Sequence, residues 1–157
     1  MTPRGAVALV SVALGVLAVG VLAVVARRRL LVVSVSGASM GPAYGPGTRV
    51  LVVRGRRARP GDVVVLDGAL VAPVPTDVPD EAGGLVVKRV AAGPGHPVPA
   101  EVLGVVGARS GDVVPPDSLV VLGDAPEASV DSRLWGFVPV DAVVGRVATV
   151  LAPGAVQ

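Results

Sequence analysis

An uncharged apolar segment near the start of the chain, GAVALVSVALGVLAVGVLAVVA, most constrains the fold. It covers residues 5–26 and contains a single serine as its polar side chain. As a helix rising about 1.5 Å per residue it would extend roughly 33 Å, enough for a hydrocarbon core of about 30 Å. A cleaved signal peptide has a shorter apolar region, of roughly 7 to 15 residues. Because three arginines follow this longer run, we predict a retained anchor over residues 1–29, with a transmembrane helix at about 5–26.

The rest of the chain, residues 30–157, has the pattern of an all-β domain. Aromatic residues make up only 2% of the sequence, so its core must consist of valine, leucine and alanine. Turn signals such as GPGTR, RPGD and RSGD separate the apolar runs, and none of these runs has a helical period. The segment 67–84, rich in proline and acidic residues, is expected to be an exposed loop. The predicted strands cover 30–35, 50–53, 63–66, 85–91, 102–106, 119–122 and 143–151.

Composition excludes several kinds of site. The absence of cysteine excludes disulfides, thiolate catalysis and cysteine-ligated metals. The only histidine, His96, excludes a multi-histidine metal site, and its GPGHPVP context predicts an exposed turn. We therefore predict no metal and no cofactor.

The distribution of charge argues against nucleic acid as a partner. From residue 30 onward ten basic residues face twelve acidic ones, so the basic excess lies around the anchor, where arginines can meet lipid headgroups. The run RGRRARPG, residues 54–61, lacks interleaved aromatic residues and is expected to be a solvated hairpin tip.

A serine and a lysine stand out as a possible reactive pair. Ser39 lies in a glycine- and proline-rich turn between two apolar runs, where serine is common for structural reasons alone. To act as a nucleophile it needs a base nearby. Lys88 is the only lysine beside thirteen arginines, and it follows the apolar run LVV. A buried lysine has a lowered pKa and can act as a base, whereas a lysine at a strand end can keep its ammonium group in solvent; the pattern alone leaves both open.

Four segments in order resemble the conserved boxes of type I signal peptidases. SGASMGPAYGPGTRVLV resembles the nucleophile box, RPGDVVVL the strand that follows it, and VVKRVAAGPG the lysine box. GDAPEASVDSRLWGFVPVDAVVGRV resembles the last box. Together with the preceding apolar segment they cover nearly the whole chain, which is similar to the compact members of the family.

The resemblance implies a role for each matching residue. Ser39 matches the nucleophile and Lys88 the general base, with Ser129 orienting the lysine amine. The backbone N–H of Ser39 matches one oxyanion donor. The family's second donor is in some members a serine at the position of Gly37, which leaves that donor open here. Residues that support the loop beneath the site match Gly123, Asp124, Asp131 and Arg133.

Some of these positions also fit ordinary structural roles. Asp131 and Arg133 alone would fit a surface ion pair. Ser129 alone would fit a loop hydroxyl, and Trp135 a packing anchor.

A few positions depart from the family pattern. Ala125 stands where asparagine is usual and Thr48 where aspartate is usual. Gly41 and His96 replace residues that are frequently polar or acidic in the family. None of these changes affects Ser39 or Lys88, and they favour a divergent member or one of narrow specificity.

The resemblance also implies a substrate cleft beside the strand at 85–88. Bulky apolar walls would leave shallow pockets for alanine or glycine before the scissile bond. The predicted substrate-binding residues are Val35, Met40, Tyr44, Val50, Val86 and Val87.

The predicted function is a membrane-anchored serine endopeptidase that cleaves signal or pro-sequences from exported precursor proteins. Two alternatives remain open: a dedicated maturation protease for one partner, and a non-catalytic membrane-tethered β-domain that binds peptides. The predicted location is the outer side of the cell membrane, with a single pass. The arginines at 27–29 oppose this orientation under the positive-inside rule, whereas the cleavage of exported precursors requires it.

Overall fold

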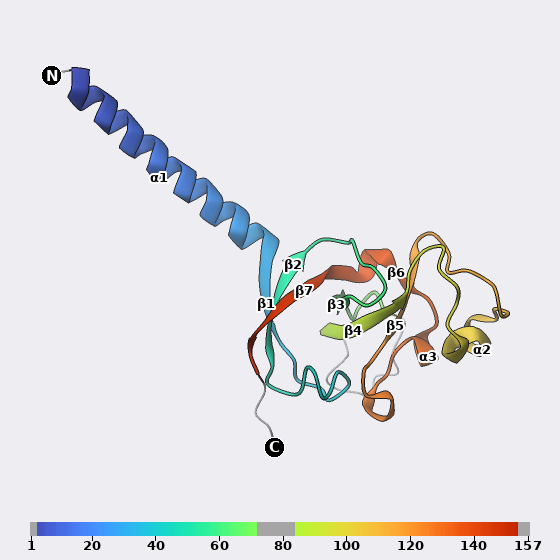
Figure 1. Cartoon of the computed structure of the whole chain (residues 1–157). Coiled ribbons are helices and arrows are strands. Elements are labelled where there is room, and N and C mark those ends of the chain that lie inside the picture. The colour runs from blue at the N-terminus through green and yellow to red at the C-terminus, as the bar shows by residue number, and fades with distance from the viewer. Residues whose placement is uncertain (1–2, 72–83, 154–157) are drawn as a thin grey trace.

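A long helix leads into an antiparallel sheet in the computed structural model, which describes residues 3–71 and 84–153. Helix α1 (Pro3–Arg29) projects away from the sheet (Figure 1). Its last turn carries Arg27, Arg28 and Arg29, which interact favourably with the negative end of the helix dipole. The predicted helical segment is therefore confirmed as a helix.

The predicted transmembrane assignment of this helix is not supported. Within residues 3–71 and 84–153, no helix combines the length and apolar character that a membrane crossing requires.

Seven antiparallel strands form one sheet in the order β1-β2-β7-β3-β4-β5-β6. Valine dominates these strands because its branched side chain packs well on a pleated surface. The last strand in the chain, β7, lies between β2 and β3 and pairs with both. The strands are β1 (Leu30–Ser34), β2 (Arg49–Arg54), β3 (Val63–Asp67), β4 (Leu85–Ala92), β5 (Ser118–Leu122), β6 (Val138–Pro139) and β7 (Val143–Ala152).

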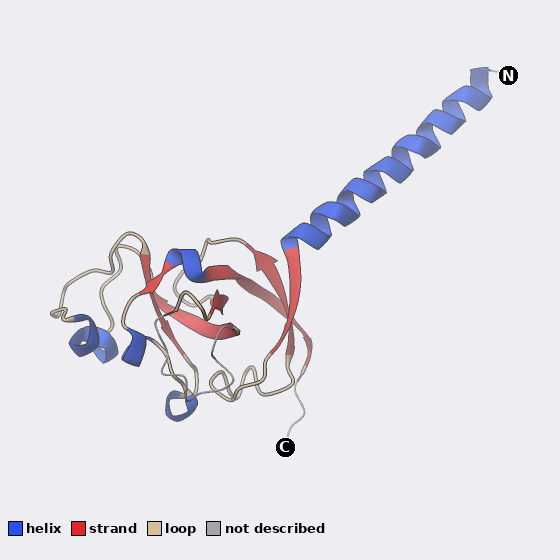
Figure 2. Cartoon of the chain, turned by 180° about the vertical axis from the view of Figure 1, so that it is seen from behind, coloured by secondary structure: helices blue, strands red, loops and turns tan. Residues whose placement is uncertain are grey.

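Only short helical segments interrupt the sheet domain. Figure 2 shows that they lie toward the end of the domain remote from α1. No helix after residue 30 exceeds four residues in the described part of the chain, in line with the absence of helical periodicity there. These segments are η1 (Ala100–Val102), α2 (Leu103–Val106), η2 (Pro126–Ala128), α3 (Ser132–Trp135) and η3 (Val140–Ala142).

The core consists almost entirely of aliphatic side chains, as the composition predicts. Strand β3 is buried on both faces over Val63, Val64, Val65 and Leu66. One cluster packs around Met40, directly after Ser39, and includes Val65 of β3. The segment that carries Ser39 is therefore anchored to the centre of the sheet.

Three predictions about the elements need correction. The run 102–106 is helical, because Val102 alone is fully buried and Gly107, at φ 65°, ends the segment as a left-handed cap. The run 54–61 is not a hairpin tip, since β7 separates β2 from β3 and the connection crosses it. The two-residue strand β6 was not expected.

The predicted exposed loop 67–84 lies mostly outside the described residues. Of its described part, Ala69 and Leu70 are exposed, as expected. Val71, by contrast, is buried in the core beside Leu66. His96 is exposed in its turn, as predicted.

Candidate active site

Ser39 and Lys88 lie in hydrogen-bond contact although 49 residues separate them in the sequence. The Lys88 ammonium donates to the Ser39 hydroxyl, with Nζ and Oγ 2.8 Å apart. Ser39 lies in the connection between β1 and β2, and Lys88 lies in the middle of β4. The lysine is fully buried, with 0% of its surface exposed, so the alternative of a solvent-exposed ammonium is wrong.

Two hydrophobic residues lie next to Lys88. Its partner across the β3–β4 pairing is the buried Val64. The ring centroid of Trp135 lies 5.8 Å from Nζ, within reach of a cation–π contact. Removal from water disfavours the charged form of an amine, and the neutral form is the one that can accept a proton.

The loop after β5 packs directly against the backbone of Ser39. The Ala125 N–H donates to the Ser39 carbonyl over 3.0 Å. A Cβ added at Gly123 would lie 2.6 Å from the same carbonyl oxygen and 2.2 Å from Ser129 Oγ. Only glycine fits at position 123, and the loop thereby holds Ser129 next to the Ser39 backbone.

Asp131 organises this loop from a fully buried position. It accepts from the Gly123 N–H over 2.8 Å and from the Ser129 hydroxyl over 2.7 Å. The Arg133 Nε also donates to it, over 2.9 Å. Burial by itself would raise the pKa of Asp131, but the bonds from Arg133, Gly123 and Ser129 outweigh it and lower the pKa to about 2. Asp131 and Arg133 are therefore not an ordinary surface pair.

Asp124 connects the same loop to the strand that carries the lysine. It receives two hydrogen bonds from Arg89, at 2.8 Å from Nε and 2.6 Å from Nη2. The hydrogen bond and the charge of Asp124 raise the pKa of Arg89 against the effect of burial. Arg89 also donates to the Gly61 carbonyl over 3.0 Å.

Sequence reasoning missed two supporting residues. Arg89 follows Lys88 directly, and the alternation of side chains along a strand gives the two residues opposite faces. From this alternation the sequence could have indicated that Arg89 lies on the face of β4 opposite to Lys88. Ser132 is buried, and its hydroxyl accepts from the Val121 N–H over 2.9 Å. It lies in the segment that resembles the last box, and that position was the available signal.

A small cavity of about 60 Å³ opens beside Ser39, between the segment before it and the start of β4. Four of the six predicted substrate-binding residues line it, namely Val35, Met40, Val86 and Val87. The other two, Tyr44 and Val50, are not among its lining residues and pack in the cluster around Met40. The lining residues are Ser34, Val35, Ser36, Gly37, Ser39, Met40, Leu85, Val86 and Val87.

Residues 101–152 match a protein-family model described as "Signal peptidase, peptidase S26". The matched region contains Asp124, Ser129, Asp131 and Arg133, whereas Ser39 and Lys88 lie outside it. No curated protein matches the sequence. The family match agrees with the resemblance found in the sequence: over residues 101–152 the chain is similar to signal peptidases of this family, which are serine peptidases.

Proposed function

We propose that the protein is a serine endopeptidase that removes signal or pro-sequences from exported precursor proteins, with Ser39 and Lys88 as its catalytic dyad. The observation that carries the proposal is the 2.8 Å contact between Lys88 Nζ and Ser39 Oγ at a lysine with no exposed surface. A serine hydroxyl becomes a nucleophile when an adjacent base can take its proton.

In the proposed reaction neutral Lys88 accepts the proton of Ser39 Oγ as this oxygen attacks the scissile carbonyl. The tetrahedral intermediate collapses as Lys88 gives the proton to the leaving amine, and an acyl-enzyme remains on Ser39. Lys88 then takes a proton from water, whose oxygen attacks the ester, and gives this proton to Ser39 Oγ as the ester bond breaks and the acid product leaves. The Ser39 N–H is the proposed oxyanion donor, and the Gly37 backbone lines the same cavity.

The supporting residues keep their proposed roles in this scheme. Ser129 donates its hydroxyl proton to Asp131, and this bond would fix the oxygen that is proposed to orient the lysine amine. Asp131, Arg133, Gly123 and Asp124 hold the loop against the Ser39 backbone.

An extended peptide can reach the dyad along the start of β4. Strand β5 pairs with β4 only from Arg89 onward, whereas β3 pairs with it from Leu85. One edge of β4 next to Lys88 is therefore not taken by β5, and a substrate strand could add there. The adjoining cavity, at about 60 Å³, fits a side chain as small as alanine. We infer a preference for small residues before the cut.

A cleavage assay on a model precursor tests the activity. The wild-type chain should cleave it, and Ser39→Ala should leave the precursor intact while circular dichroism shows a folded protein. Replacing alanine by phenylalanine directly before the scissile bond should abolish cleavage by the wild type. Equal turnover of the two precursors would contradict the proposed pocket.

An acylating inhibitor separates the proposal from its alternatives. Covalent labelling at Ser39 is expected for a peptidase, and its absence would favour a peptide-binding domain without catalysis. Cleavage of one precursor among several unrelated ones would identify a dedicated maturation protease. Ala125 and Thr48 depart from the family pattern, and such departures favour a member of narrow specificity.

A further inference from the structure

A second, larger hollow lies where α1 joins the sheet domain. Its volume is about 580 Å³, and it shares no lining residue with the cavity beside Ser39. Six arginines and one aspartate line it, together with one valine and one glycine. We call it the arginine basin, and its residues are Arg29, Val53, Arg54, Gly55, Arg56, Arg57, Arg59, Asp62 and Arg146.

The basin keeps a strong positive charge despite two ion pairs. Arg146 lies 3.5 Å from Asp62, and Arg56 lies 2.8 Å from Asp141, which is outside the lining. The Arg56 and Asp141 side chains are 66% and 71% exposed, and pairs this exposed contribute little to stability. Asp62 also accepts a hydrogen bond from the backbone N–H of Arg59. This bond does not involve the Arg59 guanidinium group, so it does not offset the charge of that side chain.

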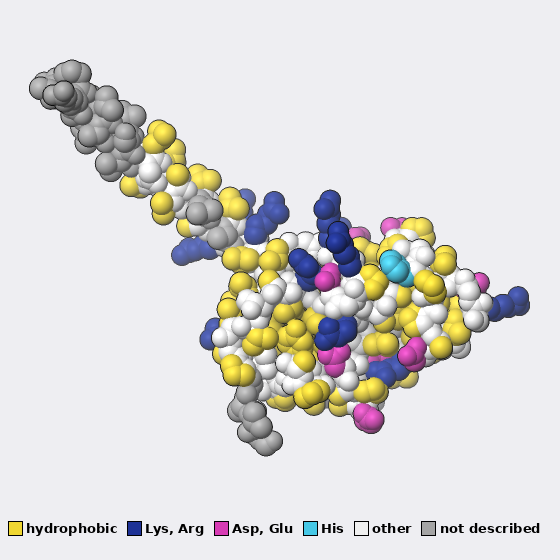
Figure 3. Space-filling view, in the orientation of Figure 1, with side chains coloured by type: hydrophobic (Ala, Val, Ile, Leu, Met, Phe, Trp, Pro, Cys, Tyr) yellow, Lys and Arg dark blue, Asp and Glu magenta, His cyan; other side chains and the backbone are white. Residues whose placement is uncertain are grey.

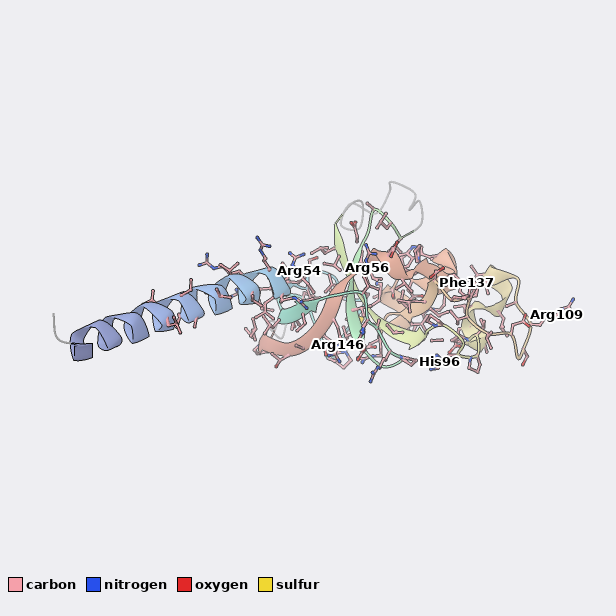
Figure 4. The ribbon with its side chains drawn as sticks, turned by 90° about the horizontal axis from the view of Figure 1, so that it is seen from above. Arg54, Arg56, His96, Arg109, Phe137 and Arg146 are labelled. Carbon is pink, nitrogen blue, oxygen red and sulfur yellow. The ribbon has the colours of Figure 1, made fainter. Side chains whose placement is uncertain are left out.

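The position of the basin ties it to α1. Arg29, the last residue of the helix, lines it. Lys and Arg side chains gather around the junction of the helix with the domain (Figure 3). In Figure 4, Arg54 lies beside the end of α1 and Arg109 lies at the opposite end of the molecule. The helix itself exposes large apolar side chains up to this junction, among them Leu17, Val21 and Val25.

We propose that the arginine basin binds the phosphate groups of anionic phospholipids at the surface of a membrane. Guanidinium groups bind phosphate oxygens in pairs, and several arginines around one hollow can hold more than one headgroup. An exposed apolar helix that ends at a cluster of arginines matches the order of a bilayer, with acyl chains below the phosphates. This proposal is independent of the peptidase activity.

The same features argue for lipid rather than nucleic acid. Single-stranded nucleic acids bind grooves that combine positive charge with aromatic side chains on which bases stack. No aromatic residue lines the basin. The adjoining surface is α1 with its exposed apolar side chains, which a nucleic acid would not cover.

Protection of the arginines from phenylglyoxal, a neutral reagent for guanidinium groups, tests the proposal in the full chain. Modification rates would be compared by mass spectrometry in vesicles of phosphatidylcholine and in vesicles that also contain phosphatidylglycerol. Arg56, Arg57 and Arg59 should each react about fivefold more slowly on the anionic vesicles, as expected for about 1 kcal/mol per basic residue at such a surface. High salt should remove this protection. Arg109, exposed and distant, is the internal control and should react equally on both.

Two further arms decide the source of the phosphate. Inorganic phosphate and a single-stranded oligonucleotide, each added to phosphatidylcholine vesicles, should protect the basin arginines less than the anionic membrane does. Equal or greater protection by either one would overturn the lipid assignment. So would equal rates on both kinds of vesicle, or a chain that associates with neither.

Discussion

At the scale of single residues, the distinction between lysine and arginine decides the chemistry of the site. The chain uses arginine for every basic side chain except Lys88, and Lys88 is the one that is fully buried beside a serine hydroxyl. Arginine stays protonated at any working pH, whereas a buried lysine can give up its charge. The surface of the domain therefore carries permanent charge, and the proposed site carries a group able to exchange protons.

The first prediction concerns Lys88→Arg. If Lys88 is the general base, this variant should lose about two to four orders of magnitude in cleavage rate, because arginine cannot accept the Ser39 proton. Ser39→Ala should be similarly inactive, and the double variant little worse than either, as expected for residues that act as a unit. Initial rates in detergent measure this, with circular dichroism as the control for folding. A folded Lys88→Arg variant of near-normal rate would exclude the dyad.

The second prediction concerns Asp131 and pH. Its pKa is about 2 in the folded protein against 3.8 for the ordinary side chain, so ionised Asp131 stabilises the fold by about 2 kcal/mol above pH 4. This contribution should be lost as pH falls from about 4 to about 2, because protonation then weakens the bonds from Arg133 and Gly123.

Urea unfolding of Asp131→Asn measures this effect. The variant should lose about 2 kcal/mol of unfolding free energy at pH 7 and much less near pH 2. Asp117→Asn, which removes the same charge from an exposed aspartate, is the matched control and should change little at either pH. A loss that is equal at both pH values would show that the charge of Asp131 is not what stabilises the loop.

At the scale of elements, the site depends on how closely the loop after β5 approaches the β1–β2 connection. Gly123 is the closest point, with the Ser39 carbonyl on one side and Ser129 on the other. The contact with Ser39 is made by backbone atoms, so on that side it cannot adjust by a change of rotamer.

The third prediction is that Gly123→Ala lowers the cleavage rate of a protein that still folds. The new methyl group would lie 2.6 Å from the Ser39 carbonyl oxygen, so the loop and the serine must move apart. A displacement of this kind can cost about a hundredfold in rate. Gly104→Ala in α2, where a Cβ meets nothing within 4 Å, is the matched control. Equal rates for both variants would show that the spacing does not matter.

The elements also show what the sequence could predict. Six valine-rich strands were predictable because the branched side chains and the flanking turns agree along each run. The run 102–106 was not, because five apolar residues fit a strand or a helical turn equally and only the burial of Val102 decides between them. The β2–β3 connection was misjudged because sequence neighbours usually pair, and here β7 lies between them.

The site could be predicted only so far. Ser39 and Lys88 were found because their residue types and family boxes both indicate chemistry, and the structure brings them into contact. Arg89 was missed because an arginine on a strand has no local signal that names Asp124 as its partner. Tyr44 and Val50 were assigned to the cleft by resemblance, but neither lines the cavity beside Ser39: Val50 is buried in the cluster around Met40, and the half-buried Tyr44 packs against it.

At the scale of the whole molecule, the two hollows are lined by different parts of the domain. The arginine basin lies at the α1 junction, and the cavity beside Ser39 is lined by other residues altogether. In the proposed function the basin would face a membrane surface while the dyad stays open to precursor chains. We propose, as for the exported substrates, that this happens on the outer side of the cell membrane.

The fourth prediction tests this location with a single cysteine. The chain has none of its own, and Leu70 is 51% exposed just after β3, so Leu70→Cys should give one accessible thiol. An impermeant maleimide should label this variant in intact cells as completely as in lysed cells, with the cysteine-free wild type as the blank. Labelling only after lysis would place the domain on the inner side.

The central position of β7 also affects the order in which the site can assemble during synthesis. Ser39 belongs to the β1–β2 unit and Lys88 to the β3–β4 unit, and β7 is the strand that pairs with both β2 and β3. Synthesis proceeds from the N-terminus, so both halves exist before residues 143–152 have been made, and β7 cannot join them until then. In the proposed function, the dyad would therefore form in one late step, when β7 inserts and closes the sheet.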